Sequence, residues 1–507
     1  MIAVLDFGSQ YNLLITRRLR ELGHASEMFR YDVSARELLA RSVRALVLSG
    51  GPATVLDNEI LPRRDVLDLG LPTLGICYGM QALCHLLGGR VERGQSGEYG
   101  RQVVELDRES VLLTGAQRPF EAWMSHFDQV VSLPPGVRTI ARTDTCPHAA
   151  AEDPARKLFM VQFHPEVSHT SQGELVLRNF LRTVDGLEAD WRLEDFPARA
   201  IEKMRAQVGK GRLLCAVSGG VDSTVAAVLA HRALGDQLAP IFVDHGLLRQ
   251  DEAAQVDEIL RGQLGLPLHS VDASERFLAA LEGVEDPERK RKIIGETFIR
   301  VFEQEAQRVG PVDFLLQGTL YPDVIESTSV RGPSATIKSH HNVGGLPEHM
   351  KLGLVEPLRE LFKDEVRLVG RMLAIPEVIL GRHPFPGPGL AVRVLGPLTP
   401  ERIARVRRAD AIFLDELRRG GEYDKIWQAF AVLLPVKSVG VMGDERTYAE
   451  TIALRGVTSV DGMTADWSRI PYEILERASL RIVNEVPGVN RVVYDVTSKP
   501  PGTIEWE

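Results

Sequence analysis

The stretch TLGICYGMQALCHLL, residues 73–87, decides the fold of the N-terminal part of this chain. Its first four residues form an apolar run typical of a buried strand, and residues 79–87 have the apolar spacing of a helix that glycines then end. Strands that alternate with helices predict an α/β fold, a largely parallel sheet with helices on its faces. Shorter runs with Pro and Gly turns, from about residue 103 to 162, predict an antiparallel extension. Two further strands and a helix are predicted at residues 2–5, 45–48 and 10–22.

Cys77 lies where the predicted strand meets the predicted helix, with glycines two residues before and after it. Small residues allow the tight turn that presents a nucleophile above a sheet, and a helix N-terminus favours the thiolate form of cysteine. The backbone N–H of Tyr78 would then face a developing oxyanion. The alternative for a lone cysteine is an ordinary buried side chain, which is what we expect of Cys84 inside the apolar helix.

A second motif, VQFHPE at residues 161–166, supplies a base and a carboxylate. On a strand, positions two apart face the same side, so His164 and Glu166 can project together, and Pro165 indicates a strand end. A base that is oriented by a carboxylate is the partner that a nucleophilic cysteine needs for acyl chemistry. The two motifs together therefore predict a Cys–His–Glu site.

The pattern GxCxGxQ followed by HPE resembles the class I glutamine amidotransferase domain, a mixed sheet flanked by helices. The resemblance implies that Cys77, His164 and Glu166 hydrolyse the side-chain amide of glutamine through a glutamyl thioester and release ammonia. The family sequence WMSHGD is WMSHFD here, with Phe127 where glycine is typical. The resemblance also implies oxyanion and glutamine contacts from Gly51, Tyr78, Gln81, Ser125 and His126.

A second centre follows the apolar run LLCAV at residues 213–217, which leads through SGGVDST into an apolar helix at 225–234. Glycines let the backbone approach a phosphate, while hydroxyls and a helix N-terminus supply donors. The lysine of a Walker A motif is absent, which disfavours γ-phosphate transfer. A glycine pair alone could also be a plain turn.

The full string SGGxDS resembles the PP-loop of Rossmann-like pyrophosphatase domains, which cleave ATP to AMP and pyrophosphate. Mg²⁺ prefers one or two carboxylates together with phosphate oxygens, so Asp222 is the expected metal ligand. The residues expected to bind ATP are Ser218, Gly219, Gly220, Val221, Asp222, Ser223 and Thr224.

Two other polar segments leave alternatives open. The loop at 337–347 is either solvated or a mobile lid in which Lys338 offsets phosphate charge. The basic run ERKRK at 288–292 is either a solvated helix face or a contact for a nucleotide phosphate.

Composition bounds the classes of function. The chain has 507 residues, 44% apolar and 25% charged, with a net charge of −9, which argues against a protein built to grip nucleic acid. No apolar run approaches the roughly 18 residues of a membrane helix. Four cysteines are too few for a disulfide framework, so we expect a cytoplasmic protein.

Two composition shifts indicate domain boundaries: the acidic segment at 185–195 and the Pro/Gly cluster HPFPGPG at 383–389, which cannot be regular helix or central strand. The chain is therefore predicted to be an α/β multidomain protein. The expected domains are an amidotransferase domain at 1–190, an ATP pyrophosphatase domain at 191–382 and a C-terminal α+β domain at 383–507.

Long strings in the last region, at 383–396, 428–444 and 484–507, resemble the glutamine-hydrolysing GMP synthetase family, and the resemblance covers essentially the whole chain. It implies that ATP adenylates the C2 oxygen of XMP with Mg²⁺, and that ammonia then displaces AMP to give GMP. It also implies a homodimer formed by the C-terminal domain. Arg393 and Lys499 are the expected partners of the XMP phosphate, and Gln428, Ile504 and Glu505 those of the base.

Two alternatives belong to other classes. The synthetase half could act on another acceptor, as in glutamine-dependent NAD synthetase or an asparagine-type ligase, although the C-terminal strings argue against this. The chain could also be a nucleotide-binding regulator without turnover, which the intact Cys77, His164, Glu166 and SGGVDS disfavour.

Overall fold

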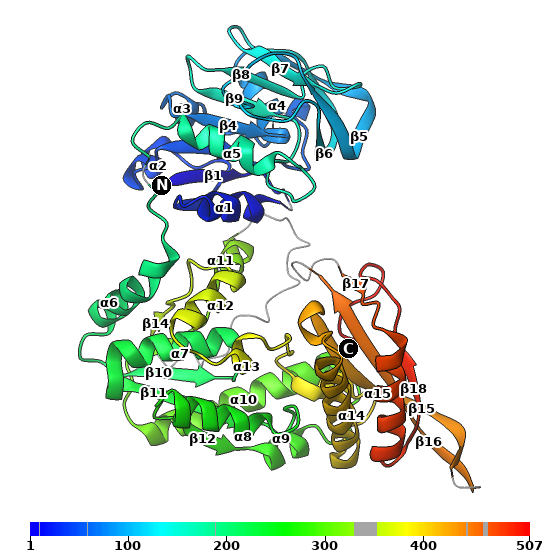
Figure 1. Cartoon of the computed structure of the whole chain (residues 1–507). Coiled ribbons are helices and arrows are strands. Elements are labelled where there is room, and N and C mark those ends of the chain that lie inside the picture. The colour runs from blue at the N-terminus through cyan, green and yellow to red at the C-terminus, as the bar shows by residue number, and fades with distance from the viewer. Residues whose placement is uncertain (10, 58, 188, 329–351, 443–444, 460–464) are drawn as a thin grey trace. The chain divides into compact units, whose positions relative to one another are not determined.

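The computed structural model describes the chain apart from residues 10, 58, 188, 329–351, 443–444 and 460–464 (Figure 1). The chain forms two compact units. The first contains Met1–Leu193 and a short segment from Pro322, and the second contains Glu194–Tyr321 and the C-terminal part of the chain. Among the residues that the structure describes, no helix is long and apolar enough to cross a membrane.

The first unit is built on one nine-stranded mixed sheet. Its first five strands are mutually parallel and its last four are antiparallel, which confirms the predicted parallel sheet and its antiparallel extension. The strands follow one another in the order β2 (Ser26–Arg30), β1 (Ile2–Asp6), β3 (Ala45–Leu48), β4 (Thr73–Ile76), β9 (Leu158–Val161), β8 (Ala150–Asp153), β7 (Arg138–Arg142), β5 (Arg90–Leu106) and β6 (Phe120–Ser132).

Helices cover this sheet, and α4 matters most because it follows β4 directly. It ends as the sequence predicts: the N–H of Gly89 donates to the carbonyl of Cys84 at 2.7 Å, and Gly88 adopts a φ of +90° that favours glycine. The helices of this unit are α1 (Asn12–Glu21), α2 (Ala35–Ala40), α3 (Arg64–Leu67), α4 (Tyr78–Leu86) and α5 (Gly173–Arg182).

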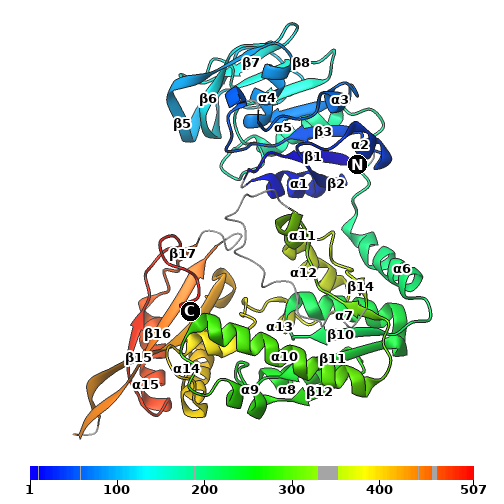
Figure 2. The same ribbon diagram turned by 180° about the vertical axis from the view of Figure 1, so that it is seen from behind.

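The second unit contains a five-stranded parallel sheet with β10 at its centre. Helix α7 (Val221–Leu234) follows β10, and α10 (Pro287–Val309) lies across the other face, as the two views show (Figures 1 and 2). The strand order is β12 (His269–Asp272), β11 (Leu238–Asp244), β10 (Leu213–Val217), β13 (Phe314–Leu316) and β14 (Gly353–Val355). The other helices of this part of the unit are α6 (Phe196–Val208), α8 (Glu252–Asp257), α9 (Ser274–Ala280), α12 (Lys363–Met372) and α13 (Glu377–Leu380), whereas α11 (Tyr321–Thr328) belongs to the first unit from Pro322 on.

A smaller sheet forms the C-terminal part of the same unit. In it β15 (Gln428–Met442) pairs with β16 (Glu445–Thr458), which also pairs with β17 (Asp466–Trp467) and, in parallel, with β18 (Val489–Tyr494). Helices α14 (Pro400–Arg419) and α15 (Tyr472–Glu485) pack with it. One apolar core includes Leu214 of β10 and Ile452 of β16. The Pro/Gly segment 383–388 forms neither helix nor strand, as expected.

Candidate active sites

Cys77 occupies the tight turn between β4 and α4 that the sequence predicts. Its φ is +51°, in the left-handed region that a non-glycine residue seldom adopts, and its side chain is buried. The flanking glycines are required: a Cβ at Gly79 would lie 2.2 Å from the carbonyl oxygen of Leu48, and one at Gly75 would lie 2.8 Å from the backbone of Gly79. The turn therefore holds the sulfur at the N-terminus of α4.

His164 and Glu166 form a buried pair, with 2.7 Å between Nδ1 of the histidine and Oε1 of the carboxylate. The reason is not the strand alternation that we expected, because β9 ends at Val161 and both residues lie in the turns that follow it. The loop is fixed from outside instead. The N–H of His164 donates to the carbonyl of Trp123 at 3.0 Å, and the hydroxyl of Thr170 donates to the carbonyl of His164 at 2.6 Å.

Gly50 lies between the base and the nucleophile. A Cβ there would be 3.0 Å from Cε1 of His164 and 3.7 Å from Cβ of Cys77. Burial opposes the charge of His164, but the Glu166 carboxylate and the Cys77 sulfur outweigh it and raise the pKa of His164 well above its usual value. The structure therefore brings together the three residues predicted as catalytic, with a cationic imidazole beside the sulfur.

Two of the residues expected to bind glutamine, Ser125 and Gln81, contact Cys77 directly. The carbonyl oxygen of Ser125 lies 3.6 Å from the Cys77 sulfur. The side-chain amide of Gln81 donates to the carbonyl of Asp128 at 2.8 Å. His126 is buried and contacts Oε2 of Glu98 at 2.9 Å. Gly51 packs against Phe7, since a Cβ would lie 2.6 Å from the carbonyl oxygen of that residue.

Phe127, which replaces the usual glycine, leaves the local backbone regular. Strand β6 runs through it without a break, and its ring lies under the guanidinium of Arg93, 5.0 Å from the ring centroid. Residues 94–97 bulge out of β5 opposite it, because pairing passes from Arg93–Asp128 to Glu98–His126. Phe127 therefore lies in a regular strand, opposite an irregular part of its partner strand.

The loop at 218–224 joins β10 to α7 and is held by its own hydroxyls. The Ser218 and Ser223 hydroxyls lie 2.9 Å apart, and the N–H of Ser218 donates to Ser223 Oγ at 3.2 Å. Gly219 has a φ of +76°, and Gly220 is the N-cap of α7. Val221 is buried in the first turn of that helix. This is the geometry of a phosphate cradle at a helix N-terminus.

Two buried polar atoms of this loop have no partner: Oδ1 of Asp222 and Oγ1 of Thr224. Nζ of Lys363, at the start of α12, lies 3.6 Å from the other oxygen of Asp222. A single carboxylate with an unused oxygen fits Mg²⁺, which takes its remaining ligands from phosphate and water. The predicted lid residue Lys338 lies outside the residues that the structure describes.

Two of the residues expected to bind XMP, Arg393 and Gln428, meet at a third, Glu505. Arg393 is fully buried and donates to both oxygens of Glu505, at 3.1 and 2.9 Å, while Gln428 donates to one of them at 2.7 Å. The carbonyl of Ile504 accepts from Arg455 at 2.8 Å, and the backbone of Lys499 pairs with Ala465. Nη1 of Arg393 is buried without a hydrogen bond, and it lies 3.7 Å from Oδ1 of Asp410.

The basic run at 288–292 is not a solvated face at its centre. Lys290 is fully buried in α10 and its Nζ donates to the carbonyl of Val394 at 2.7 Å and to Glu507 at 2.6 Å. Arg291 reaches the backbone oxygen of Glu507 as well. This run therefore ties α10 to the last residues of the chain.

Comparison with known proteins decides the family. The class I glutamine amidotransferase family matches residues 3–184, and the GMP synthase C terminal domain family matches residues 415–506. The chain is 57% identical over 511 residues to the glutamine-hydrolyzing GMP synthase of Phenylobacterium zucineum, covering 100% of this chain and 98% of that protein. The chain belongs to the glutamine-hydrolyzing GMP synthase family. Enzymes of the same name from Symbiobacterium thermophilum (57%) and Aquifex aeolicus (55%) each align with 100% of this chain and 99% of their own length.

Two residues near the sites of this GMP synthase family member were not predicted from the sequence. Lys363 begins a helix about 140 residues after the phosphate loop, and only the fold brings its ammonium group near Asp222. Glu98 lies in β5, in the segment GQSGEYG, which has no motif character of its own. Pairing of β5 with β6 would have been the signal, because it sets Glu98 opposite His126.

Proposed function

We propose that the chain makes GMP from XMP, ATP and glutamine, with ammonia released at Cys77 and used at the phosphate-loop site. The observation that carries the proposal is the His164–Glu166 pair, 2.7 Å apart beside an elbow cysteine, in the same chain as the SGGVDST loop. The full-length similarity to glutamine-hydrolyzing GMP synthases supports the choice of acceptor.

In the glutaminase step, the Cys77 sulfur attacks the side-chain amide carbon of glutamine. The backbone N–H groups of Gly51 and Tyr78 receive the oxyanion, and His164 delivers a proton to the departing ammonia. Glu166 keeps the ring oriented and supports its charge. Water then hydrolyses the thioester, with His164 as the base, and glutamate leaves.

In the synthetase step, the C2 oxygen of XMP attacks the α-phosphate of ATP and pyrophosphate departs. Residues 218–224 would hold the pyrophosphate through backbone N–H groups and the hydroxyls of Ser218, Ser223 and Thr224. Mg²⁺, when bound at Asp222, would neutralise phosphate charge there. Lys363 and, from the predicted lid, Lys338 add positive charge. Ammonia then attacks C2 and AMP leaves, which gives GMP.

The acceptor site is proposed at the C-terminal tail. Gln428, Ile504 and Glu505 are suited to a purine edge, which needs fixed donors and acceptors. Arg393 and Lys499 are suited to a phosphate. Because Arg393 is already bidentate with Glu505, its contact with phosphate requires its third nitrogen, which has no hydrogen bond but lies 3.7 Å from Oδ1 of Asp410.

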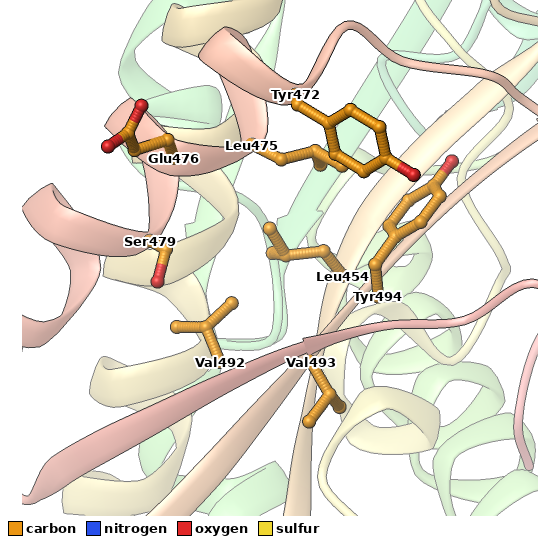
Figure 3. Close-up of a pocket in the computed structure, with 8 residues that line it drawn as sticks. All are labelled: Leu454, Tyr472, Leu475, Glu476, Ser479, Val492, Val493 and Tyr494. Atoms are coloured by element: carbon orange, nitrogen blue, oxygen red, sulfur yellow. The ribbon is translucent and has the colours of Figure 1, made fainter.

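We also propose that the C-terminal sheet forms a homodimer, in the cytoplasm, with the three domains at 1–190, 191–382 and 383–507. An apolar pocket lies between α15 and β18, lined by Leu454, Leu475, Val492 and Tyr494 (Figure 3). Tyr472 and Val493, which also line it, are exposed, and 86% of the surface of Tyr472 is accessible. Glu476 and Ser479 line its other side, and exposed apolar side chains with polar residues at their edge are typical of an interface. Sedimentation of the full chain and of Tyr472→Glu tests it: only the variant should be monomeric.

The test of the function compares wild type with Cys77→Ala, each supplied with XMP, Mg-ATP and either glutamine or ammonium, while GMP, AMP and pyrophosphate are quantified. The variant should lose the glutamine reaction and keep the ammonium reaction. If wild type forms no GMP from either nitrogen source, the acceptor is wrong. If Cys77→Ala still uses glutamine, the glutaminase assignment is wrong.

A further inference from the structure

Glu98 and His126 form a buried pair beside the glutaminase site, on neighbouring strands β5 and β6. Their side chains are each 4% exposed, and Nε2 of His126 lies 2.9 Å from Oε2 of Glu98. The other carboxylate oxygen accepts hydroxyl hydrogen bonds from Thr143 and Thr145, at 2.5 Å each. Both hydroxyls donate to this oxygen, as an ionised carboxylate requires.

The partners of His126 fix its protonation state. Nε2 faces the Glu98 carboxylate, and Nδ1 lies 3.0 Å from the carbonyl oxygen of Asp128. Both partners can only accept, so both ring nitrogens must carry a hydrogen. His126 is thus an imidazolium that a buried carboxylate neutralises. Although burial works against it, hydrogen bonds from His126, Thr143 and Thr145 lower the pKa of Glu98, in agreement with this assignment.

A metal ion is the competing occupant, because Glu98, His126 and Cys146 offer ligand atoms within 4.8 Å of one another. Neither ring nitrogen of His126 has a free lone pair in this arrangement, and both oxygens of Glu98 are engaged. Burial, followed by the charge of Glu98, raises the pKa of the Cys146 thiol to about 12, so the thiolate that a metal prefers is disfavoured. The cluster is therefore an ion pair with a neutral thiol beside it.

The pair leads directly to the nucleophile. The carbonyl of Asp128 that accepts from His126 also accepts from Gln81 at 2.8 Å, and Gln81 lies one turn after Cys77 on α4. Ser125 precedes His126, and its carbonyl oxygen contacts the Cys77 sulfur. Strand β6 is thus hydrogen-bonded to α4 at Asp128, and its Ser125 carbonyl lies against the Cys77 sulfur on the other side of His126.

We infer that Glu98 is a positioning residue for glutamine: by keeping His126 cationic it locks the Ser125–Asp128 segment of β6 against Gln81 and Cys77. Hydrogen bonds with a charged partner are about twice as strong as neutral ones, so the ion pair stiffens this segment more than a neutral pair would. The inference concerns the glutaminase site and rests on the function proposed above.

The variant Glu98→Gln isolates the charge. Its amide can accept from the two threonines and donate to Nε2 of a neutral His126, whose Nδ1–H still reaches Asp128. Every hydrogen bond of the cluster is then retained and only the ion pair is lost. We expect the KM for glutamine to rise about tenfold with kcat changed less than twofold, and the ammonium-dependent rate to stay at the wild-type value.

The spectroscopic readout is independent of activity. In the full chain labelled with ¹⁵N-histidine and assigned with His126→Gln, wild-type His126 should show two protonated ring nitrogens under the conditions of the kinetic assay, and Glu98→Gln should show one. Glu305→Gln is the matched control, since Glu305 contacts His269 at 2.8 Å in the second unit. It should leave the KM for glutamine unchanged.

Three results would overturn the inference: a neutral His126 in wild type, an unchanged KM for glutamine in Glu98→Gln, or stoichiometric Zn²⁺ binding that Glu98→Gln abolishes. Failure of the proposed function looks different, because Cys77→Ala would then keep the glutamine reaction whatever happens at Glu98. Thermal unfolding of Glu98→Gln, expected within a few degrees of wild type, separates positioning from misfolding.

Discussion

The glutaminase site and the phosphate-loop site differ in how many of their polar groups are paired before any substrate binds. In the first, His164, Glu166 and the Cys77 sulfur already have protein partners, and one oxygen of Glu166 is the exception. In the second, Asp222 and Thr224 each carry a buried oxygen without a partner, although the Asp222 side chain as a whole is 29% exposed. Because a buried unpaired polar atom is costly, the second site is built to be completed by its ligands, whereas the first is assembled by the fold itself.

The buried histidines of the two units also differ, in their charge. His164 is held cationic by Glu166 and the sulfur of Cys77 against the effect of burial. In the second unit, His383 donates from Nε2 to Tyr423 and accepts at Nδ1 from the N–H of Ala429, which is a neutral tautomer. Burial lowers the pKa of His383, and that of His245, to about 4.

The largest effect is expected at the preassembled site. Glu166→Gln removes the charge that supports His164 and should lower the glutamine-dependent rate about 10²- to 10⁴-fold, the range that general acid–base catalysis supplies. The ammonium-dependent rate, measured in the same preparations, should not change. A glutamine-dependent rate within threefold of wild type would show that Glu166 does not support the base.

The second prediction concerns pH and the second unit. His245 and His383 stay neutral in the folded state down to about pH 4, but when unfolded they take up protons below about pH 6.5. The unfolded state then binds more protons, so the free energy of unfolding falls as pH falls from 6.5 towards 4, by about 3 kcal/mol per histidine. His164 acts in the opposite sense: its stabilising contribution is complete below pH 6.5 and is lost as pH rises through its raised pKa.

Urea unfolding of the full chain at pH 7 and pH 5 measures this change in the free energy of unfolding. His383→Gln should remove about half of the decrease that is assigned to the second unit. An equal pH dependence in wild type and variant would mean that the buried histidines do not cause it.

The smallest effect is expected from removing single unpaired hydroxyls. The prediction compares one that would bind a ligand with one that would not. Thr224→Val removes an unpartnered hydroxyl of the phosphate loop and should raise the KM for ATP severalfold. Thr16→Val, in the first unit, removes a buried hydroxyl that also has no partner, and should raise stability by about 1 kcal/mol with no change in any KM. Equal KM values for ATP in both variants would argue against a phosphate contact at Thr224.

Local sequence patterns predicted the parts of each site that one strand–turn–helix segment contains. The turn at Cys77 and the loop at 218–224 form where their glycines and apolar runs require. The His164–Glu166 pair was predicted for an incorrect reason, since a loop held by Trp123 and Thr170 brings the two together. These contacts join residues that are about 40 positions apart or fewer. They form only when strands pair and loops pack in the folded chain, so the local sequence does not predict them.

Lys363 and Glu98 could not be predicted for the same physical reason. Each reaches its site through tertiary structure, and neither lies in a segment whose own pattern sets it apart. Lys290 shows the converse. A basic run is typical of a solvated surface, yet the side chain of Lys290 is fully buried and its ammonium group donates to carbonyl oxygens and a carboxylate.

The left-handed backbone at Cys77 has a consequence for protein engineering. A glycine would occupy this turn with less strain, so the nucleophile is a place where the chain gives up stability in return for activity. A screen that selects only for heat resistance, with ammonium as the nitrogen source, would tolerate and even favour the loss of this cysteine. Directed evolution of the chain therefore needs glutamine in every round, or it will return a thermostable enzyme that depends on ammonium.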